Sequence, residues 1–164
     1  MWKSSFVAVL LGTTLIAQSQ AQTPSQQPVQ WQIDVMRDGQ QIDSFSATTP
    51  VGQAHTDTHH QKVTHNVGCK DQPAGSIDLA RTLTVSPLNA DPGHVTLSIE
   101  AQETVEDNSH PITIEGCKLP PQPRQVAASH PGLQVTGDQW TNWTIVDKDP
   151  QIIYRVRAHL ADQP

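Results

Sequence analysis

The sequence contains little positive charge and, beyond its first residues, no long apolar run. Ten Lys and Arg residues stand against 16 Asp and Glu residues, which gives a formal net charge of −6. Nucleic acids and anionic membrane surfaces require a basic footprint, so this balance argues against both as partners. No segment after residue 17 is apolar enough to cross a bilayer, which takes roughly 20 residues. We therefore do not expect an integral membrane protein once the N-terminal segment is removed.

Several catalytic motifs are also missing from the sequence. It has no G-x-S-x-G turn, no C-x-x-C pair and no glycine-rich phosphate loop. The pairs Ser109-His110 and Ser129-His130 each precede a proline and have no orienting carboxylate that the sequence identifies. The sequence favours a non-enzymatic protein, with a small hydrolase as an alternative.

Residues 1–21 have the pattern of a secretory signal peptide. Lys3 supplies a positive start, and residues 6–17 form an apolar run that is too short to span a membrane. Small residues, Ser19 and Ala21, occupy the positions that a signal peptidase reads. We expect cleavage near Ala21-Gln22 and a periplasmic or secreted protein; an uncleaved N-terminal helix is the alternative.

The expected mature chain comprises a polar leader over residues 22–29 and a single domain over residues 30–164. A chain of this length can bury one hydrophobic core. Its two cysteines, Cys69 and Cys117, would enter an oxidising compartment, where an even count favours pairing. The sequence therefore predicts one disulfide, with free thiols or metal ligands as the alternative.

The period of the apolar residues predicts strands throughout the domain. Apolar and polar residues alternate over residues 30–35, 77–85 and 95–101, whereas no stretch sustains a 3.6-residue period. Asp38-Gly39 is typical of a tight hairpin turn, and turn residues also fill 86–93 and 147–150. These signals predict an all-β fold of about eight antiparallel strands, with a β-sandwich as the expected architecture and a barrel as the second choice.

Two stretches of this pattern carry specific expectations. A short strand is predicted over residues 112–114, and the prolines at residues 120–123 exclude a helix or a central strand there. Arg81 interrupts the apolar face of residues 77–85. We expect it to lie at a margin of the core or to pair with a carboxylate.

Histidines are concentrated in residues 55–65, which contain four of the eight in the chain. On a strand, His55, Asp57 and His59 point to one side, and two imidazoles with a carboxylate could begin a zinc or copper site. The spacing matches no zinc motif, so an exposed polar strand and a pH-sensing segment are the alternatives. The candidate metal ligands are His55, Asp57, His59, His60 and His65.

One hairpin is similar to a known family. Residues 75–87 end in Leu83-Thr84-Val85-Ser86-Pro87, and residues 93–101 return as Val95-Thr96-Leu97-Ser98-Ile99. The pair resembles the hairpin of the homology region of bacterial outer-membrane secretins, and Gly52-Gln53 resembles the entry to a strand of the same family. The resemblance covers about 30 residues and carries over no functional residue. It implies a role in envelope secretion or pilus machinery.

Together these observations predict an exported, periplasmic, non-enzymatic β-sandwich that binds a protein partner, and the resemblance implies that this partner belongs to an envelope assembly. No cofactor is expected under this hypothesis. The alternative is a periplasmic zinc- or copper-binding protein that uses the segment from His55 to His65.

Overall fold

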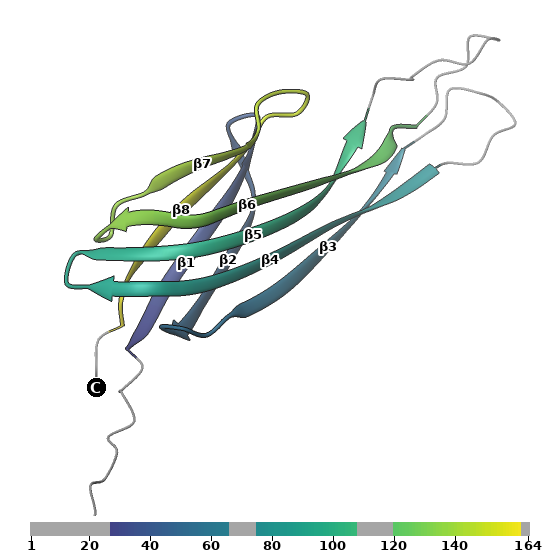
Figure 1. The fold of residues 1–164 in the computed structure, drawn as a ribbon. Helices are drawn as coiled ribbons and strands as arrows, with labels where there is room; N and C mark the ends of the chain where they lie inside the picture. Colours follow the sequence, from purple (N-terminus) through teal and green to yellow (C-terminus); the bar gives the residue numbers. More distant parts are fainter. Residues whose placement is uncertain (1–26, 66–74, 108–119, 162–164) are drawn as a thin grey trace, which may run out of the picture.

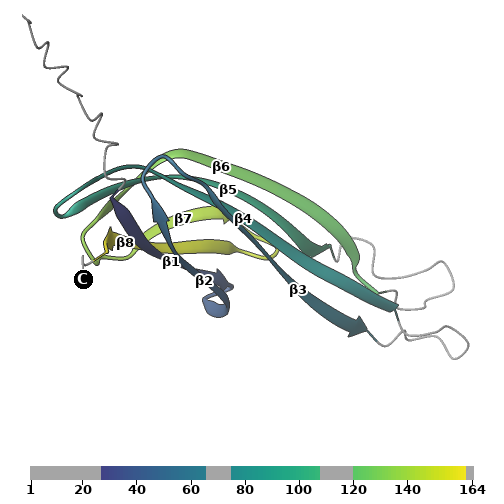
Figure 2. The same cartoon turned by 90° about the horizontal axis from the view of Figure 1, so that it is seen from below.

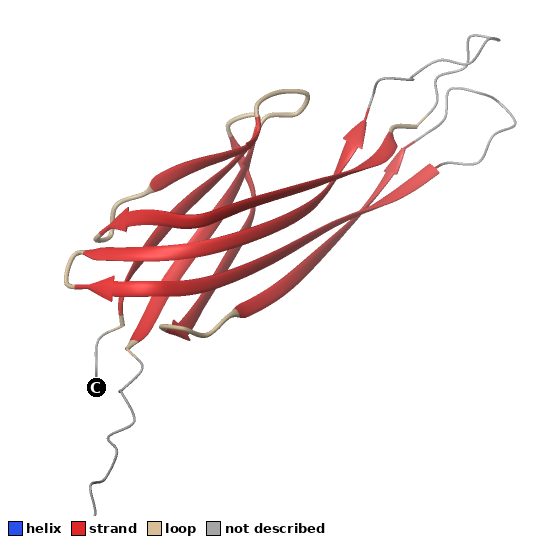
Figure 3. Cartoon of the chain, viewed as in Figure 1, coloured by secondary structure: helices blue, strands red, loops and turns tan. Residues whose placement is uncertain are grey.

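The structure is a computed structural model that describes residues 27–65, 75–107 and 120–161. All regular secondary structure in these residues is β-strand (Figure 3). The strands are β1 (Pro28–Arg37), β2 (Gln40–Pro50), β3 (His55–His65), β4 (Gly75–Asp91), β5 (His94–Asp107), β6 (Gln122–Thr136), β7 (Thr141–Val146) and β8 (Ile152–Leu160).

The strands form two four-stranded sheets, and every pair within them is antiparallel. Sheet A has the order β2-β1-β8-β7, and sheet B has the order β3-β4-β5-β6 (Figure 1). The chain passes from sheet A to sheet B after β2, returns after β6, and closes sheet A by pairing β8 with β1. The predicted all-β class and the sandwich-like arrangement of two antiparallel sheets are confirmed.

Two hairpins follow their turn signals. Asp38 and Gly39 have φ values of 50° and 82°, the left-handed backbone of a two-residue turn, and they join β1 to β2 as predicted. In the other hairpin the predicted turn over residues 86–93 is too wide, because β4 continues to Asp91 and the chain reverses at Gly93. A register shift after Pro87 lets β4 accommodate this proline, which has no N–H to donate to the ladder.

The strand β6 was not predicted from the sequence. It includes Pro123 and Pro131, which break the apolar alternation on which the prediction depended. Both prolines are tolerated because β6 is an edge strand, and residues 131–132 fall in a register shift against Leu97 and Ile99. The predicted strand over residues 112–114, the signal peptide, and both Cys69 and Cys117 lie outside the described residues.

The core lies between the two sheets and is formed by the inward-facing side chains of β1, β2, β4, β5, β6 and β8. Trp31, Tyr154 and Phe45 of sheet A are its largest fully buried side chains. The Trp31 indole N–H donates to Thr49 Oγ1 at 3.0 Å, which satisfies the one polar atom of that ring. Val29 is also fully buried. The strand β1 begins at Pro28, two residues before the predicted start of the domain at residue 30.

Sheet B is longer than sheet A at one end. The ends of β3–β6 that adjoin residues 66–74 and 108–119 continue past sheet A, and the two views agree on this (Figures 1 and 2). The sheets therefore diverge there, and the inner face of sheet B loses its opposing layer. The candidate site lies at this divergence.

Candidate functional site

The predicted histidine segment forms β3, an edge strand of sheet B. It pairs with β4 without a register shift, and His55, Asp57 and His59 lie opposite Val85, Leu83 and Arg81 in that pairing. These β4 residues are buried, so the three β3 residues share the face that is directed toward sheet A. The segment is therefore an uninterrupted strand along the side of the sandwich.

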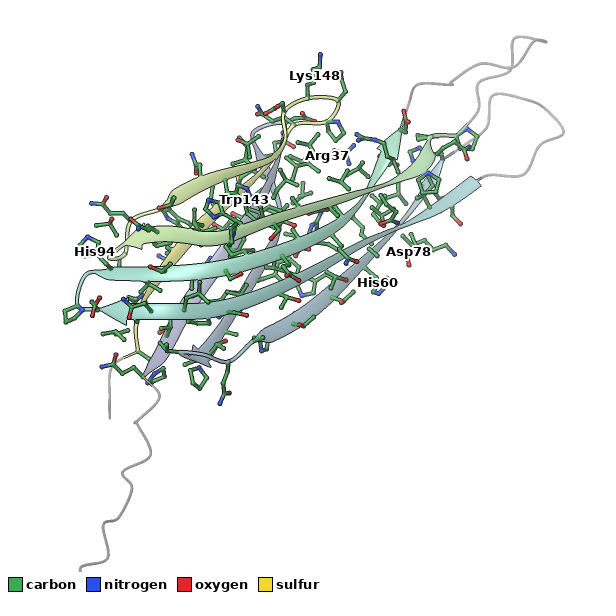
Figure 4. The ribbon with its side chains drawn as sticks, in the orientation of Figure 1. Arg37, His60, Asp78, His94, Trp143 and Lys148 are labelled. Carbon is green, nitrogen blue, oxygen red and sulfur yellow. The ribbon has the colours of Figure 1, made fainter. Side chains whose placement is uncertain are left out.

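The histidines of β3 have separate partners. The ring of His55 lies edge-on to Trp31, with 5.7 Å between centroids. His60 lies on the outer face beside Asp78, with its Nδ1 atom 2.9 Å from Asp78 Oδ2 (Figure 4). His65 Nε2 is hydrogen-bonded to Glu106 Oε1.

His59 has contacts on both of its ring nitrogens. Nδ1 lies 2.9 Å from Asp43 Oδ1, Nε2 lies 3.4 Å from Asp57 Oδ2, and the ring stacks on Phe45 with 4.1 Å between centroids. In the part of the chain that the structure describes, no group of three or more His, Cys, Asp or Glu side chains is arranged to hold a metal ion. A zinc or copper site at these residues stays a prediction.

A buried polar network joins the two sheets at the level of His59. Arg81 donates from Nε to Glu103 Oε1 and from Nη1 to Asp43 Oδ2, each at 2.6 Å. The Tyr154 hydroxyl also donates to Glu103 Oε1 at 2.6 Å. We call this set the cross-sheet network; its members are Asp43, His59, Arg81, Glu103 and Tyr154.

Strand register explains why these side chains meet. His59 pairs with Arg81 and Arg81 pairs with Glu103, so these three form a row across β3, β4 and β5. In sheet A, Asp43 and Tyr154 both pair with Val35 and form a parallel row across β2, β1 and β8. The two rows face one another, and their polar atoms meet in the middle of the sandwich.

Burial and pairing shift the protonation equilibria of three members of the network. Burial alone would raise the pKa of Asp43, but hydrogen bonds from His59 and Arg81 outweigh burial and lower it below 3.8. Burial would lower the pKa of Arg81, but the partners Glu103 and Asp43 raise it. Burial, followed by the negative charge of Glu103, raises the pKa of Tyr154 far above its usual value. The network therefore holds an ionised Asp43, a cationic Arg81 and a protonated Tyr154 at neutral pH.

One atom of the network lacks a hydrogen-bond partner. Glu103 is 1 % exposed, and its Oε1 atom accepts two hydrogen bonds. Its Oε2 atom is buried and has no partner among the described residues. A buried carboxylate oxygen without a donor is costly, so this atom marks a place where a hydrogen-bond donor would be stabilised.

A cavity of about 380 Å³ lies on the open side of the cross-sheet network. Its polar wall includes Arg37, Arg81, Glu103 and Glu106, and its apolar wall includes Ile42, Val63, Leu79, Val105 and Ile152. A second hollow of about 480 Å³ adjoins it toward β2 and β3 and shares Ile42, Gln61, Leu79 and Arg81. The network thus separates the closed apolar core from a space between the diverging sheets.

Arg37 and Glu106 also connect the sheets beside this cavity. Arg37 Nη2 from the end of β1 lies 3.4 Å from Glu106 Oε2 on β5, and Glu106 is also bonded to His65 on β3. Glu106 is 9 % exposed. Two sets of charged side chains therefore lie beside the cavity: the cross-sheet network, and Arg37 with Glu106. Each set connects sheet A with sheet B.

Sequence reasoning found only part of this site. Arg81 was expected to lie at a margin of the core or to pair with a carboxylate; it is buried and pairs with two. Glu103 was missed, although it continues the inward parity of Val95, Leu97, Ile99 and Ala101 by one more step. Asp43 was missed although it shares the parity of the buried Phe45. In both cases a carboxylate on an apolar face was the available signal.

Outside the cavity, an aromatic and basic cluster covers the outer face of sheet A. The Arg155 and Arg157 guanidinium groups each lie 4.8 Å from the centroid of the Trp140 ring. Arg157 also donates to Gln32 Oε1 from Nε and Nη2. By contrast, Trp143 packs against the core edge-on to Tyr154 (Figure 4). These contacts account for both tryptophans as parts of the folded sandwich.

Two further findings bear on what the chain is. No helix in residues 27–65, 75–107 and 120–161 is long and apolar enough to cross a membrane. Comparison with protein-family models, with curated proteins and with solved structures finds no match.

Proposed function

We propose that this chain is an exported, non-enzymatic binding protein whose binding site is the cavity between the diverging sheets. The observation that carries the proposal is the cross-sheet network, which places fixed charged groups against that cavity. Small-molecule sites are concave, mainly apolar, and hold a few placed polar groups. A volume of about 380 Å³ is at the lower end of such sites, and its lining is more polar than usual, with apolar and polar residues in equal share.

The polar groups at the cavity are held in place before any ligand arrives. Glu103 is held by Arg81 and Tyr154, and Arg81 is held in turn by Asp43 from the opposite sheet. Fixing such groups in the free protein reduces the entropy lost on binding.

A mapped ligand titration tests the binding proposal. Backbone amide NMR signals of the mature protein are followed while a library of small fragments is added. We expect shifts concentrated on residues that line the cavity, such as Ile42, Leu79 and Val105. Fragments that bind elsewhere, or none that bind, would overturn the proposal.

A matched pair of variants sharpens this test. Leu79→Trp fills the cavity, whereas Ala80→Trp adds the same side chain to the opposite face of the same strand. We expect Leu79→Trp to abolish fragment binding and Ala80→Trp to retain it. Equal loss in both variants would indicate a general effect on the sheet and would count against the cavity.

The location and partner in this proposal depend on other parts of the sequence. Export rests on residues 1–21, and a role in envelope secretion or pilus machinery rests on the secretin-like hairpin. Expression of the full chain in a bacterium should yield a periplasmic protein that starts at Gln22. Affinity capture from cross-linked envelopes should then recover a secretion or pilus component. A cytoplasmic chain that keeps residues 1–21 would contradict export.

A further inference from the structure

We propose that the cavity takes a ligand with a primary ammonium head group and an apolar tail, and that the ammonium donates to Glu103 Oε2. This inference deepens the proposed function and rests on it. It assigns the chemical class of the ligand and the atom that recognises it.

The first argument is the hydrogen-bonding state of Glu103. Oε1 already accepts from Arg81 Nε and from the Tyr154 hydroxyl, each at 2.6 Å. Oε2 has no donor within the described part of the molecule, and Glu103 is part of the cavity wall. Oε2 itself is buried, and the cavity that Glu103 lines is the adjoining space from which a donor would approach it. An ammonium is the strongest such donor, because its hydrogen bond to a carboxylate is charge-assisted.

The second argument is the balance of charge around the cavity. The charged groups of the cavity wall are two carboxylates, Glu103 and Glu106, and two guanidinium groups, Arg37 and Arg81. Both guanidinium groups are already paired with carboxylates, so an anionic ligand would be repelled by the carboxylates beside each of them. A cation instead meets a carboxylate oxygen without a donor, Glu103 Oε2, and the low dielectric of a buried site strengthens that attraction.

The third argument is the remainder of the wall. Ile42, Val63, Leu79, Val105 and Ile152 supply apolar surface beside the charged groups. Hydration of this surface is unfavourable, and an alkyl chain would remove it from water. The wall therefore suits a molecule with one cationic end and one apolar end.

The test compares three probes that share a six-carbon chain and differ in their head group. Hexylammonium, hexanoate and hexanol are each titrated into the mature protein, with binding followed by the amide signals of the cavity residues. We expect hexylammonium to bind about tenfold or more tighter than the other two, the change that one hydrogen bond to a charged group supplies. Equal or tighter binding of hexanol or hexanoate would overturn the inference.

Variants of Glu103 and its neighbours decide which atom is responsible. Glu103→Gln should reduce hexylammonium binding to the level of hexanol, whereas Glu100→Gln should leave it unchanged. Glu100 is the matched control, because it is on the same strand but exposed on the opposite face. Should Glu103→Gln fail to fold, Tyr154→Phe frees one acceptor site on Glu103 and should bind hexylammonium at least as tightly. Weaker binding in Tyr154→Phe, or unchanged binding in a folded Glu103→Gln, would overturn the inference.

The outcomes separate this inference from the proposed function. If fragments bind in the cavity but hexylammonium binds no tighter than hexanol or hexanoate, the proposed binding function is supported and the ammonium assignment is wrong. Failure of both the library and the three probes to shift the cavity residues would remove both.

Discussion

Arg81 lies directly opposite Glu103 on the neighbouring strand, with its Nε atom 2.6 Å from Glu103 Oε1. Arg81 is 9 % exposed and Glu103 is 1 % exposed, so each side chain is stabilised by its partner and hardly by water. A buried ion pair gains little net stability, because desolvation offsets much of the attraction. Removal of one partner is costly, because the other charge is left buried without compensation.

The first prediction concerns this pair. Arg81→Met should lower the free energy of unfolding by about 3–5 kcal/mol, because Glu103 and Asp43 both lose their cation. The double variant Arg81→Met with Glu103→Leu should recover part of that loss, since no carboxylate then remains buried at position 103. Urea unfolding measures both, with Lys62→Met, an exposed cation on β3, as the control. A loss in Arg81→Met no larger than in Lys62→Met would contradict the prediction.

The second prediction concerns acid stability. The pKa of Asp43 is lower in the folded protein than its usual value of 3.8, because hydrogen bonds from His59 and Arg81 outweigh the effect of burial. Its contribution to stability is therefore complete above pH 3.8 and is lost as the pH falls through the folded-state pKa. Asp43→Asn should be less stable than wild type at neutral pH, and the difference should shrink below pH 3.8. Urea unfolding as a function of pH measures this.

A control accompanies the acid experiment. Asp147 is exposed beyond the end of β7, and Asp147→Asn removes a carboxylate without affecting the cross-sheet network. Its unfolding free energy should follow that of wild type across the whole pH range. A constant gap between Asp43→Asn and wild type at every pH would show that Asp43 does not act through its charge.

The third prediction uses the single tyrosine of the chain, Tyr154. Burial and the adjacent Glu103 raise the pKa of this tyrosine above its usual value of 10.0. Its protonated form therefore stabilises the fold fully below pH 10.0, and that stability declines as the pH rises further. Tyrosinate absorbance should appear together with the loss of the far-ultraviolet circular dichroism of the strands. Ionisation near pH 10.0 in a protein that remains folded would contradict this.

The fourth prediction concerns Cys69 and Cys117. Both segments that contain them connect strands at the same end of sheet B, since β3 and β5 end there and β4 and β6 begin there. We expect no free thiol in the oxidised mature protein. Reduction should cost roughly 4 kcal/mol in the chain-entropy account of a loop of about 49 residues. Cys69→Ser with Cys117→Ser should match the reduced protein; two titratable thiols before reduction would contradict pairing.

The fifth prediction concerns metal. Binding of zinc or copper at β3 would require His59 to give up contacts to Asp43 and Asp57, while His60 faces the other side of the sheet. We therefore expect no upward shift in thermal unfolding at either metal. A ligand in hundredfold excess over its Kd stabilises the folded state by about 2.7 kcal/mol, a shift that is easily seen. Such a shift, lost when His55, His59 and His60 are changed to Ala, would establish the metal-binding alternative.

Local signals predicted most of the strands. Trp31, Ile33 and Val35 alternate with polar residues because successive side chains of a strand point to opposite faces, and all three are buried. Asp38-Gly39 predicted its hairpin because both residues tolerate a positive φ. The strand β6 was missed because its prolines interrupt the alternation of apolar and polar residues. Prolines are tolerated at the edge of a sheet, but only the assembled sheet shows that β6 is an edge strand.

The histidine segment shows where such reasoning stops. The shared face of His55, Asp57 and His59 follows from the two-residue period alone. Their partners do not, because His59 contacts Asp43 in the other sheet and His65 contacts Glu106 on β5, one strand beyond β3's own neighbour β4. Which side chains of other strands come to lie beside these histidines cannot be inferred from the spacing of residues within β3.

The sequence by itself determined which residues of each strand share a face, because alternation is a property of the extended backbone at every position. It also determined that Arg81 would be a charge on an apolar face. Only the tertiary structure decided that Arg81 would meet Glu103 from its own sheet and Asp43 from the other, beside a cavity. Register and sheet stacking depend on the packing of all eight strands together, so the site exists only once both sheets are in place.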